Sequence, residues 1–291
     1  MNAPVQGMAP AATGWRGLAV GALELEVETE RPLPAIEHAG AALRGLLGRA
    51  LSRQVCPLPQ PACAGCALRA GCAYPLAFKP ATLPGDEARL PGYLPHAWRV
   101  PTGGRRLGLR LHLFGPGLAQ AGTIAQALCA AAAELDWAGG GGGRVRRLHD
   151  AGSGRPFAAD ALLTPLPWPV LPAGGPVQVR LCTPLATKHA GADPLWPALR
   201  TRLQRLVKLY GDGSALDLPP AAQAPWRLVS AQGRTVGLPR NGEHARLARG
   251  WRGRLTLAEL TPQAAELLAA GLLLHAGADT TLGFGRIDVK M

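Results

Sequence analysis

The feature that most constrains this 291-residue sequence is an order of elements that occurs twice. In each half, a stretch with the apolar spacing of a helix leads through a glycine-rich turn into a short basic stretch that alternates like a strand. Residues 117–137, 139–143 and 144–150 close the first half in this way, and residues 262–275 and 277–289 close the second. Because helices and strands are mixed within each half, we expect two similar α+β units in tandem.

Further periodic segments complete the two halves. Alternation of apolar and polar residues predicts strands, and apolar residues at helical spacing predict helices. The strand patterns lie at residues 18–27, 105–114, 177–182, 226–236 and 250–257, and the remaining helix patterns lie at 41–53 and 196–210. A Pro- and Gly-rich stretch at 165–176 has no period and marks a boundary. We therefore predict an N-terminal domain at 15–165 and a C-terminal domain at 176–291.

The charge balance favours a polyanionic partner. The chain has 31 Lys and Arg against 19 Asp and Glu, a formal charge of +12. Binding to phosphates would release counterions, so RNA, DNA and an anionic membrane surface are all candidates, and the arginine content is also typical of a GC-rich genome. The N-terminus lacks the pattern of an export signal, and no stretch approaches the roughly 18 apolar residues of a membrane span. We expect a cytoplasmic protein with no membrane partner.

Four cysteines lie close together in a Pro-rich segment, residues 54–80, that shows no helix or strand period. They are Cys56, Cys63, Cys66 and Cys72. The reducing cytosol disfavours disulfides, whereas a CxxC pair flanked by two more thiols offers the tetrahedral ligand set that zinc prefers. We predict a structural zinc ion that holds this insertion together. An iron–sulfur cluster and unliganded thiols are the alternatives.

Two segments of the second half resemble one protein family. Residues 272–289, LLLHAGADTTLGFGRIDV, are similar to the glycine-rich loop that closes proteins of the RAMP superfamily. Residues 179–188, VRLCTPLATK, resemble the strand and Thr-Pro-Leu turn that open their second domain. A leading basic helix, a cysteine insertion and the C-terminal loop also come in the order of the CRISPR-associated endoribonucleases that process precursor RNA. The resemblance extends over roughly residues 18–290.

This resemblance implies two tandem ferredoxin-like βαββαβ domains, with the cysteine-rich insertion after the first helix. It also implies metal-independent cleavage at the base of the CRISPR repeat hairpin. In that reaction the 2′-OH attacks the adjacent phosphate and leaves a 2′,3′-cyclic phosphate and a 5′-OH. The RNA would lie across the basic cleft between the domains and over the glycine loops. The product would stay bound by its hairpin in a ribonucleoprotein complex with other RAMP subunits.

Such a reaction needs a base, an acid and a cation beside the phosphate, and histidine and arginine suit these roles. His38 directly precedes the basic helix pattern at 41–53, where these nucleases place a catalytic histidine, so the resemblance makes it the first candidate. A solvated residue at the start of a helix is the alternative. His189 and His244 are further candidates. Because the helix itself carries Arg44 rather than a histidine, Arg44 is the candidate for the stabilising cation.

The predicted RNA-binding residues are basic side chains and loop glycines. Guanidinium groups can grip phosphates in a bidentate way, and glycine turns can present backbone N–H groups to them. Arg202 and Arg205 are expected on the face of their helix opposite a leucine stripe. The complete set is Arg49, Arg53, Arg144, Arg146, Lys188, Arg202, Arg205, Arg246, Arg249, Arg252, Gly283, Gly285 and Arg286.

Three other functions fit parts of the pattern. A RAMP-fold subunit that binds guide RNA without cutting it would share every feature except a working His38. A zinc-containing DNA-binding regulator would use the cysteines and the basic helices, although the sequence has neither helix-turn-helix nor zinc-finger spacing. A redox protein would hold an iron–sulfur cluster at the cysteines.

Overall fold

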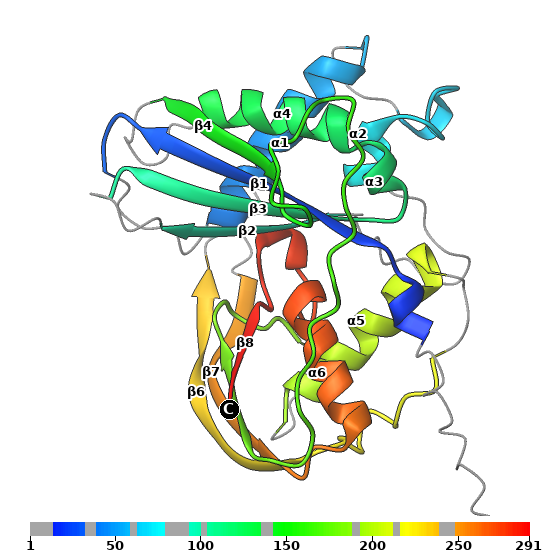
Figure 1. Cartoon of the computed structure of the whole chain (residues 1–291), viewed down its shortest axis with the longest axis vertical. Helices are drawn as coiled ribbons and strands as arrows, with labels where there is room; N and C mark the ends of the chain where they lie inside the picture. Colours follow the sequence, from blue (N-terminus) through cyan, green and yellow to red (C-terminus); the bar gives the residue numbers. More distant parts are fainter. Residues whose placement is uncertain are drawn as a thin grey trace, which may run out of the picture.

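The computed structural model describes residues 14–32, 39–58, 63–78, 93–99, 104–134, 142–187, 193–211, 216–238 and 248–291. Two four-stranded sheets, each with helices packed on one face, make up the fold (Figure 1). Within these residues, no helix combines the length and the apolar character needed to cross a membrane. The chain is thus an α+β protein of two sheet-and-helix units, as the repeated pattern predicts.

The first unit runs strand, helix, two strands, helix, strand. Its elements are β1 (Val20–Thr29), α1 (Ala39–Val55), β2 (Tyr93–Arg99), β3 (Arg106–Phe114), α4 (Ala121–Ala133) and β4 (Gly143–Asp150). The antiparallel strands lie in the order β2-β3-β1-β4. Every second residue of β3 from Leu107 to Leu113 is a buried leucine, because alternate side chains of a strand point to one face and here that face meets α1 and α4.

The second unit repeats this order of elements. They are β5 (Val177–Leu181), α5 (Leu195–Tyr210), β6 (Arg227–Leu238), β7 (Ala248–Ala258), α6 (Pro262–Leu274) and β8 (Ile287–Lys290). The antiparallel sheet has the order β6-β7-β5-β8, which is the same topology as the first. Thr261 caps α6 by accepting a hydrogen bond from the backbone of Ala264 at 3.1 Å, and Pro262 occupies the first helical position. The prediction of two tandem ferredoxin-like units is confirmed.

Two elements were missed by the sequence patterns. β2 carries Pro95, which argues against a strand, yet Pro95 pairs with Leu111 of β3. The proline is tolerated because β2 is the edge strand of its sheet, where only one side of the backbone must be paired. Within the cysteine-rich insertion, for which we expected no helix, Ala73–Phe78 forms α2, which is too short to show a period. The remaining short elements are η1 (Gly14–Gly17), η2 (Cys63–Gly65), α3 (Pro116–Ala119) and η3 (Thr280–Leu282).

The two units share apolar surface. One hydrophobic core lies between the first sheet and α1 and α4. The other lies against α5 and α6, and it also takes in Trp15, Leu18, Val20 and Phe114 from the first unit. β1 therefore begins in the second core and continues into the first. Burial of these side chains across the boundary holds the two units against each other.

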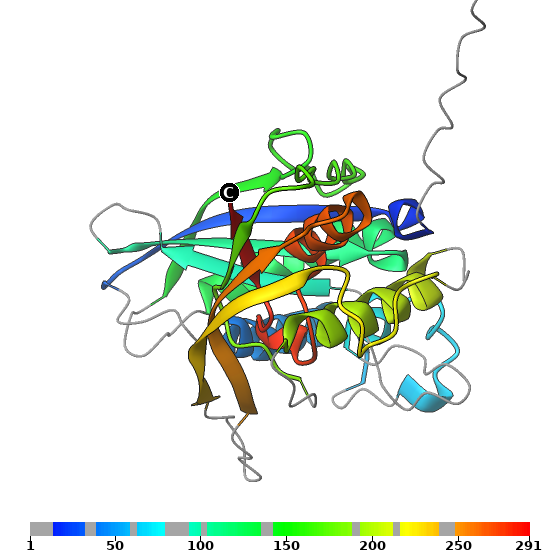
Figure 2. The ribbon, with the colours of Figure 1, turned by 90° about the horizontal axis from the view of Figure 1, so that it is seen from below.

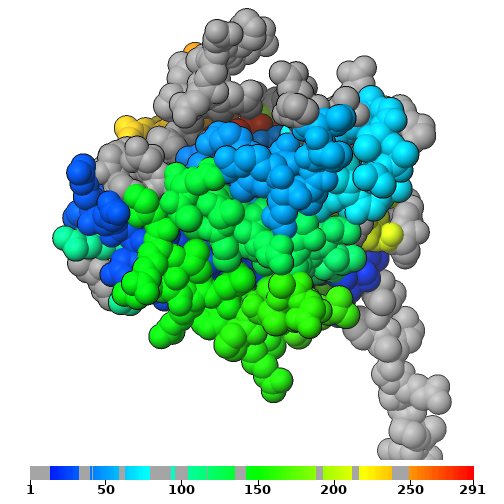
Figure 3. Space-filling view, turned by 90° about the horizontal axis from the view of Figure 1, so that it is seen from above, coloured from blue at the N-terminus to red at the C-terminus, as the bar shows by residue number. Residues whose placement is uncertain are grey.

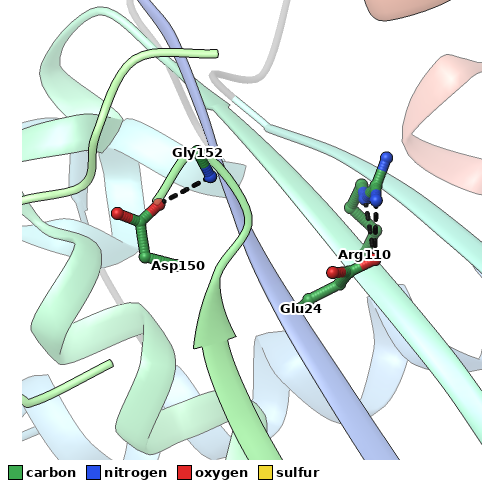
Figure 4. A network of polar contacts seen from close by, with 4 residues as sticks. All are labelled: Glu24, Arg110, Asp150 and Gly152. Carbon is green, nitrogen blue, oxygen red and sulfur yellow. Dashed lines mark hydrogen bonds and ion pairs between the residues drawn. The ribbon is translucent and has the colours of Figure 1, made fainter. Parts of the chain in front are cut away.

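A buried carboxylate anchors the connection between the units. Asp150, at the end of β4, accepts hydrogen bonds from the backbone of Gly152 at 3.0 Å (Figure 4), the hydroxyl of Ser153 at 2.8 Å and the backbone of Thr164 at 3.0 Å. Burial raises the pKa of this carboxyl, but the hydrogen bonds outweigh that effect and hold the pKa below its usual range. The start of the connecting segment is therefore fixed in place.

The open face of the first sheet carries a row of ion pairs. Three glutamates alternate along β1, and each meets an arginine from β3 or β4. The pairs are Glu24–Arg110 at 2.6 Å (Figure 4), Glu26–Arg106 at 3.1 Å and Glu28–Arg146 at 2.5 Å. All six side chains are partly exposed, so each pair adds little to the free energy of unfolding. Their main effect is to neutralise arginine charge on this face.

One buried histidine should make the stability depend on pH. His112 of β3 is 3% exposed, and burial, followed by the charge of Arg110, lowers its pKa to about 3, against a weaker opposing effect of the Leu94 backbone. Below about pH 6.5, His112 of the unfolded chain therefore binds a proton that His112 of the folded chain does not bind. The free energy of unfolding then falls by about 1.4 kcal/mol for each pH unit of acidification.

The variant His112→Leu tests this dependence. Between pH 7.5 and pH 5, urea unfolding should show the wild type losing about 2 kcal/mol more than the variant, because all other titrations are common to both proteins. Parallel stability curves for the two proteins over this range would contradict the assignment.

Candidate functional site

The segment from His275 to Arg286, which we name the glycine loop, joins α6 to β8 and reaches the boundary between the units (Figure 1). Two contacts close its base. Nδ1 of His275 donates to the carbonyl of Phe284 at 3.1 Å, and the backbone of Ala276 donates to the carbonyl of Gly285 at 2.8 Å. Gly285 has φ +72°, and a Cβ there would overlap the Ala276 carbonyl, so only glycine fits. The loop is a closed, tightly packed unit.

The turn after β5 supports the outer side of the glycine loop. The backbone of Gly285 donates to the carbonyl of Pro184 at 2.9 Å, and that of Ala278 donates to Ala186 at 2.9 Å. The hydroxyl of Thr183 accepts from the backbone of Arg286 at 2.9 Å. The two segments that carry the family resemblance are therefore bonded to each other. Each is a structural support of the other.

On its other side the glycine loop meets α1 of the first unit. Figure 2 shows the loop (red) between α1 (blue) and α5 (lime). A Cβ on Gly40 would overlap the carbonyl oxygen of Leu282, so the helix backbone lies directly against the loop. Gly283 has φ +83°, and a Cβ there would lie near the backbones of Gly40 and Pro95. The absence of side chains on both surfaces permits this approach.

Arg44 joins α1 to the glycine loop. Its Nη1 donates to the hydroxyl of Thr281 at 2.6 Å and to that of Tyr93 at 3.3 Å. The guanidinium also lies over the ring of Phe78, 5.6 Å from the centroid. Tyr93 is buried, which raises the pKa of its hydroxyl, so it stays protonated. Arg44 is thus a cation fixed at the meeting point of both units.

The loop glycines serve packing rather than anion binding. We expected the backbone N–H groups of Gly283 and Gly285 to face a phosphate, but Gly283 donates to the carbonyl of Thr280 at 2.8 Å and Gly285 donates to Pro184. A donor already bonded within the protein is not available to a ligand without breaking that bond. This correction leaves contact through the loop surface open, but not through these two N–H groups.

Several predicted site residues lie outside the described residues. They are His38, Lys188, His189, His244 and Arg246. The placement of the first catalytic candidate therefore stays a prediction from the sequence. Because α1 begins at Ala39, His38 directly precedes the helix that holds Gly40 and Arg44 against the glycine loop.

The other predicted RNA-binding arginines come from both units. Arg49 on α1, Arg144 on β4 and Arg249 on β7 are exposed. Arg53 and Arg146 each form an ion pair with a glutamate, so part of their charge is neutralised.

One member of the predicted set is misplaced. Arg202 is 2% exposed, and it lies in the core instead of on the free face of α5. Its spacing relative to the leucines was misleading because α5 is covered on two sides, by the second sheet and by the first unit. RNA cannot reach this side chain, and the prediction that it binds RNA is wrong. Arg205, Arg252 and Arg286 are half-buried.

Strand register gathers four cations that are absent from the predicted set of RNA-binding residues. Arg180, Arg234, Arg254 and Lys290 are exposed on the open face of the second sheet, opposite the face that packs on α5 and α6. Arg180 pairs directly with Arg254, an arrangement of like charges that costs stability. Asp288 is the strand neighbour of Arg180 but forms no ion pair with it. Alternation in VQVRL and RGRLTL is the signal that would have identified this face.

The four clustered cysteines are all described and all unpaired in disulfides. Cys63 is buried, Cys56 and Cys72 are half-buried, and Cys66 is exposed. Figure 3 shows the segment that carries them beside α1 on the helical face of the first unit. Among the described residues, no three His, Cys, Asp or Glu side chains are placed to hold one metal ion. The pKa of Tyr74 is raised by its partial burial and then by Cys63 and Cys56, so these two thiols lie near one hydroxyl.

Comparison with known proteins identifies the fold family of this architecture. No curated protein matches the sequence. The AF_1859_N family model, described as an N-terminal domain, matches residues 18–155, less than half of the chain. A Cas6 product complex (TTHA0078) is 19% identical and aligns over 94% of this chain and 100% of its own, with a TM-score of 0.53. The fold is that of the Cas6 proteins.

Two further structures support this assignment of fold. A second Cas6 product complex (TTHB231) is 19% identical over 93% of this chain and 100% of its own, with a TM-score of 0.54. A RAMP protein binding different RNA substrates is 12% identical over 93% of this chain and 100% of its own, with a TM-score of 0.51. The Cas6 fold thus accounts for both sheets and the helices that cover them.

Proposed function

We propose that this protein binds the repeat hairpin of CRISPR precursor RNA and cleaves it at the base without a metal ion. The observation that carries the proposal is the hydrogen bond from Arg44 to Thr281. It joins the glycine loop to α1, the helix that begins directly after His38. The Cas6 fold, and the RNA substrates named for the RAMP protein that shares this fold, support it. Since one fold can serve many functions, the proposal depends on these residues rather than on the fold alone.

In this proposal His38 removes the proton from the 2′-OH, and the 2′-oxygen attacks the adjacent phosphorus. The bond from phosphorus to the 5′-oxygen breaks, and a protonated group returns a proton to that oxygen. The products are a 2′,3′-cyclic phosphate and a 5′-OH. Nη1 of Arg44 is held by Thr281 and Tyr93, so its Nε and Nη2 are the groups that would face the charge developing on the phosphate.

The open face of the second sheet offers a path for the rest of the RNA. Arg180 and Arg254 face each other, and neither forms an ion pair with a carboxylate of the described residues, so a phosphate between them would relieve their repulsion. The double variant Arg180→Gln, Arg254→Gln should therefore fold at least as stably as the wild type. Its RNA affinity should fall, and the slope of log Kd against log salt should decrease by about 1.5 if two phosphate contacts are lost. An unchanged slope would remove this face from the binding site.

Cleavage in EDTA of the CRISPR repeat RNA from the same genome tests the function. The comparison is between the unmodified RNA and RNA with a 2′-deoxy nucleotide at the cleavage position. Cleavage of the unmodified RNA alone, with a cyclic-phosphate end, is the expected result. Tight binding without cleavage would make the protein a guide-RNA scaffold instead. Equal affinity for duplex DNA and the RNA hairpin would favour the DNA-binding alternative.

Zinc binding by Cys56, Cys63, Cys66 and Cys72 remains a proposal that rests on the donor set, since four thiols suit zinc but the structure does not gather them. We expect about one zinc ion per chain by elemental analysis of protein purified without chelators. The double variant Cys63→Ser, Cys66→Ser should lose it and melt at a lower temperature. Protein that contains iron and is brown would support the cluster alternative, and metal-free, equally stable protein would refute both.

A further inference from the structure

The arginine that was expected on the surface has an unusual environment in the core. Nε of Arg202 donates to the carbonyl of Leu274 at 3.2 Å, and its Nη2 is buried without a partner. The guanidinium lies 6.0 Å from the centroid of Phe114, which belongs to the first unit. Among the described residues, no carboxylate pairs with it. Burial lowers the pKa of Arg202 to about 10, so the side chain is still charged at neutral pH.

Burying a cation without a carboxylate partner costs free energy. The contacts of Arg202 show which part of the structure this side chain holds in place. Leu274 is the last residue of α6, where unpaired carbonyls and the helix dipole attract positive charge. The next residue, His275, has φ +56°, a conformation that costs a non-glycine residue about 1–3 kcal/mol and persists only where its surroundings enforce it. Arg202 therefore fixes the point at which the chain leaves α6.

His275 connects this fixed end of α6 to the glycine loop. Its Nδ1 donates to the carbonyl of Phe284, which ties the start of the loop to its end. The loop then presents Thr281 to Arg44 of α1. The ring of His275 also meets the buried His112 of the first unit edge to face, with centroids 6.4 Å apart. A continuous series of contacts thus leads from α5 through the loop to the helix that follows His38.

We propose that Arg202 and His275 are positioning residues, which hold the glycine loop against α1 in the arrangement that the RNA site requires. The part of this inference that concerns RNA rests on the proposed function. The part that concerns the loop does not, because it can be measured on the protein alone.

Positioning and simple stabilisation predict different results for Arg202→Met. Replacing a buried, unpaired cation by an apolar side chain of similar length is often neutral or stabilising. We therefore expect a melting temperature within a few degrees of the wild type, or above it, together with a looser glycine loop. A residue that only stabilised the fold would instead lower the melting temperature and loosen the whole molecule.

Hydrogen–deuterium exchange of the full-length protein tests the loop directly. Peptides that cover residues 276–286 should exchange about tenfold faster in Arg202→Met and in His275→Leu, while peptides from β1 and α4 keep their wild-type rates. His275→Asn is the conservative variant, since its amide can donate to Phe284 and asparagine tolerates positive φ, so it should behave like the wild type. Lys208→Met removes an exposed cation from the same helix and serves as the control.

RNA cleavage by the same variants tests the consequence. Arg202→Met and His275→Leu should cleave the repeat RNA about 10- to 100-fold more slowly at saturating protein, with Kd changed less than threefold. Unchanged exchange of the loop, or equal acceleration throughout the chain, would overturn the inference. If the wild type cleaves no RNA, the proposed function fails, but the exchange experiment still decides whether these residues position the loop.

Discussion

Replacing Gly40 by alanine is expected to lower the free energy of unfolding by about 1–3 kcal/mol, although alanine is the better helix former. The reason is tertiary, because a Cβ on Gly40 would overlap the carbonyl of Leu282 in the glycine loop. The helix and the loop must then move apart, and the Arg44–Thr281 hydrogen bond would lengthen. We also expect cleavage of the repeat RNA to slow about 100-fold, since small displacements of reacting groups have effects of this size.

Gly45→Ala is the matched control in the same helix. Gly45 is exposed, and a Cβ there would meet only the end of the Arg49 side chain at 3.7 Å. Helix propensity then acts alone and should raise the free energy of unfolding by up to about 1 kcal/mol, with unchanged cleavage. Urea unfolding and single-turnover cleavage measure both variants. If Gly40→Ala were as stable and as active as Gly45→Ala, the contact between α1 and the glycine loop would not be part of the site.

Replacing His38 by alanine is expected to have the largest effect on activity. Loss of a general base typically slows a reaction about 10²- to 10⁴-fold, so cleavage should fall by this factor while the RNA affinity stays within threefold. The placement directly before α1 supports the role, because that helix contacts the glycine loop through Gly40 and Arg44. Single-turnover cleavage and a filter-binding titration measure the two quantities separately.

The pH dependence distinguishes a base from a residue that only binds. The wild-type cleavage rate should rise with pH up to the pKa of the catalytic histidine, and this rise should be absent in His38→Ala. His189→Ala and His244→Ala are the comparison variants. Full activity of His38→Ala would exclude it as the base, and a loss confined to one of the other two would transfer the role to that residue.

The sequence alone determined the architecture. Strands alternate and helices follow a spacing of three to four residues because one face of each element must be buried. The repeated order of these patterns therefore predicted both units, and eleven of their twelve strands and main helices, all except β2, were recognised at nearly their observed bounds. β2 was missed because the rule against proline applies to central strands, and only the sheet order shows that β2 lies at the edge.

Tertiary structure decided which residues meet. Arg44 and Thr281 are far apart in the sequence, and no local pattern reveals that they form a hydrogen bond. The spacing of Arg202 is that of a surface residue, yet the docking of the first unit on α5 buries it. The glycines at positions 283 and 285 look like an anion-binding turn, but neighbouring carbonyls already bind their N–H groups. Sequence periodicity records which face of an element avoids water, whereas contacts between distant segments depend on how those faces pack, and this packing placed the glycine loop against α1.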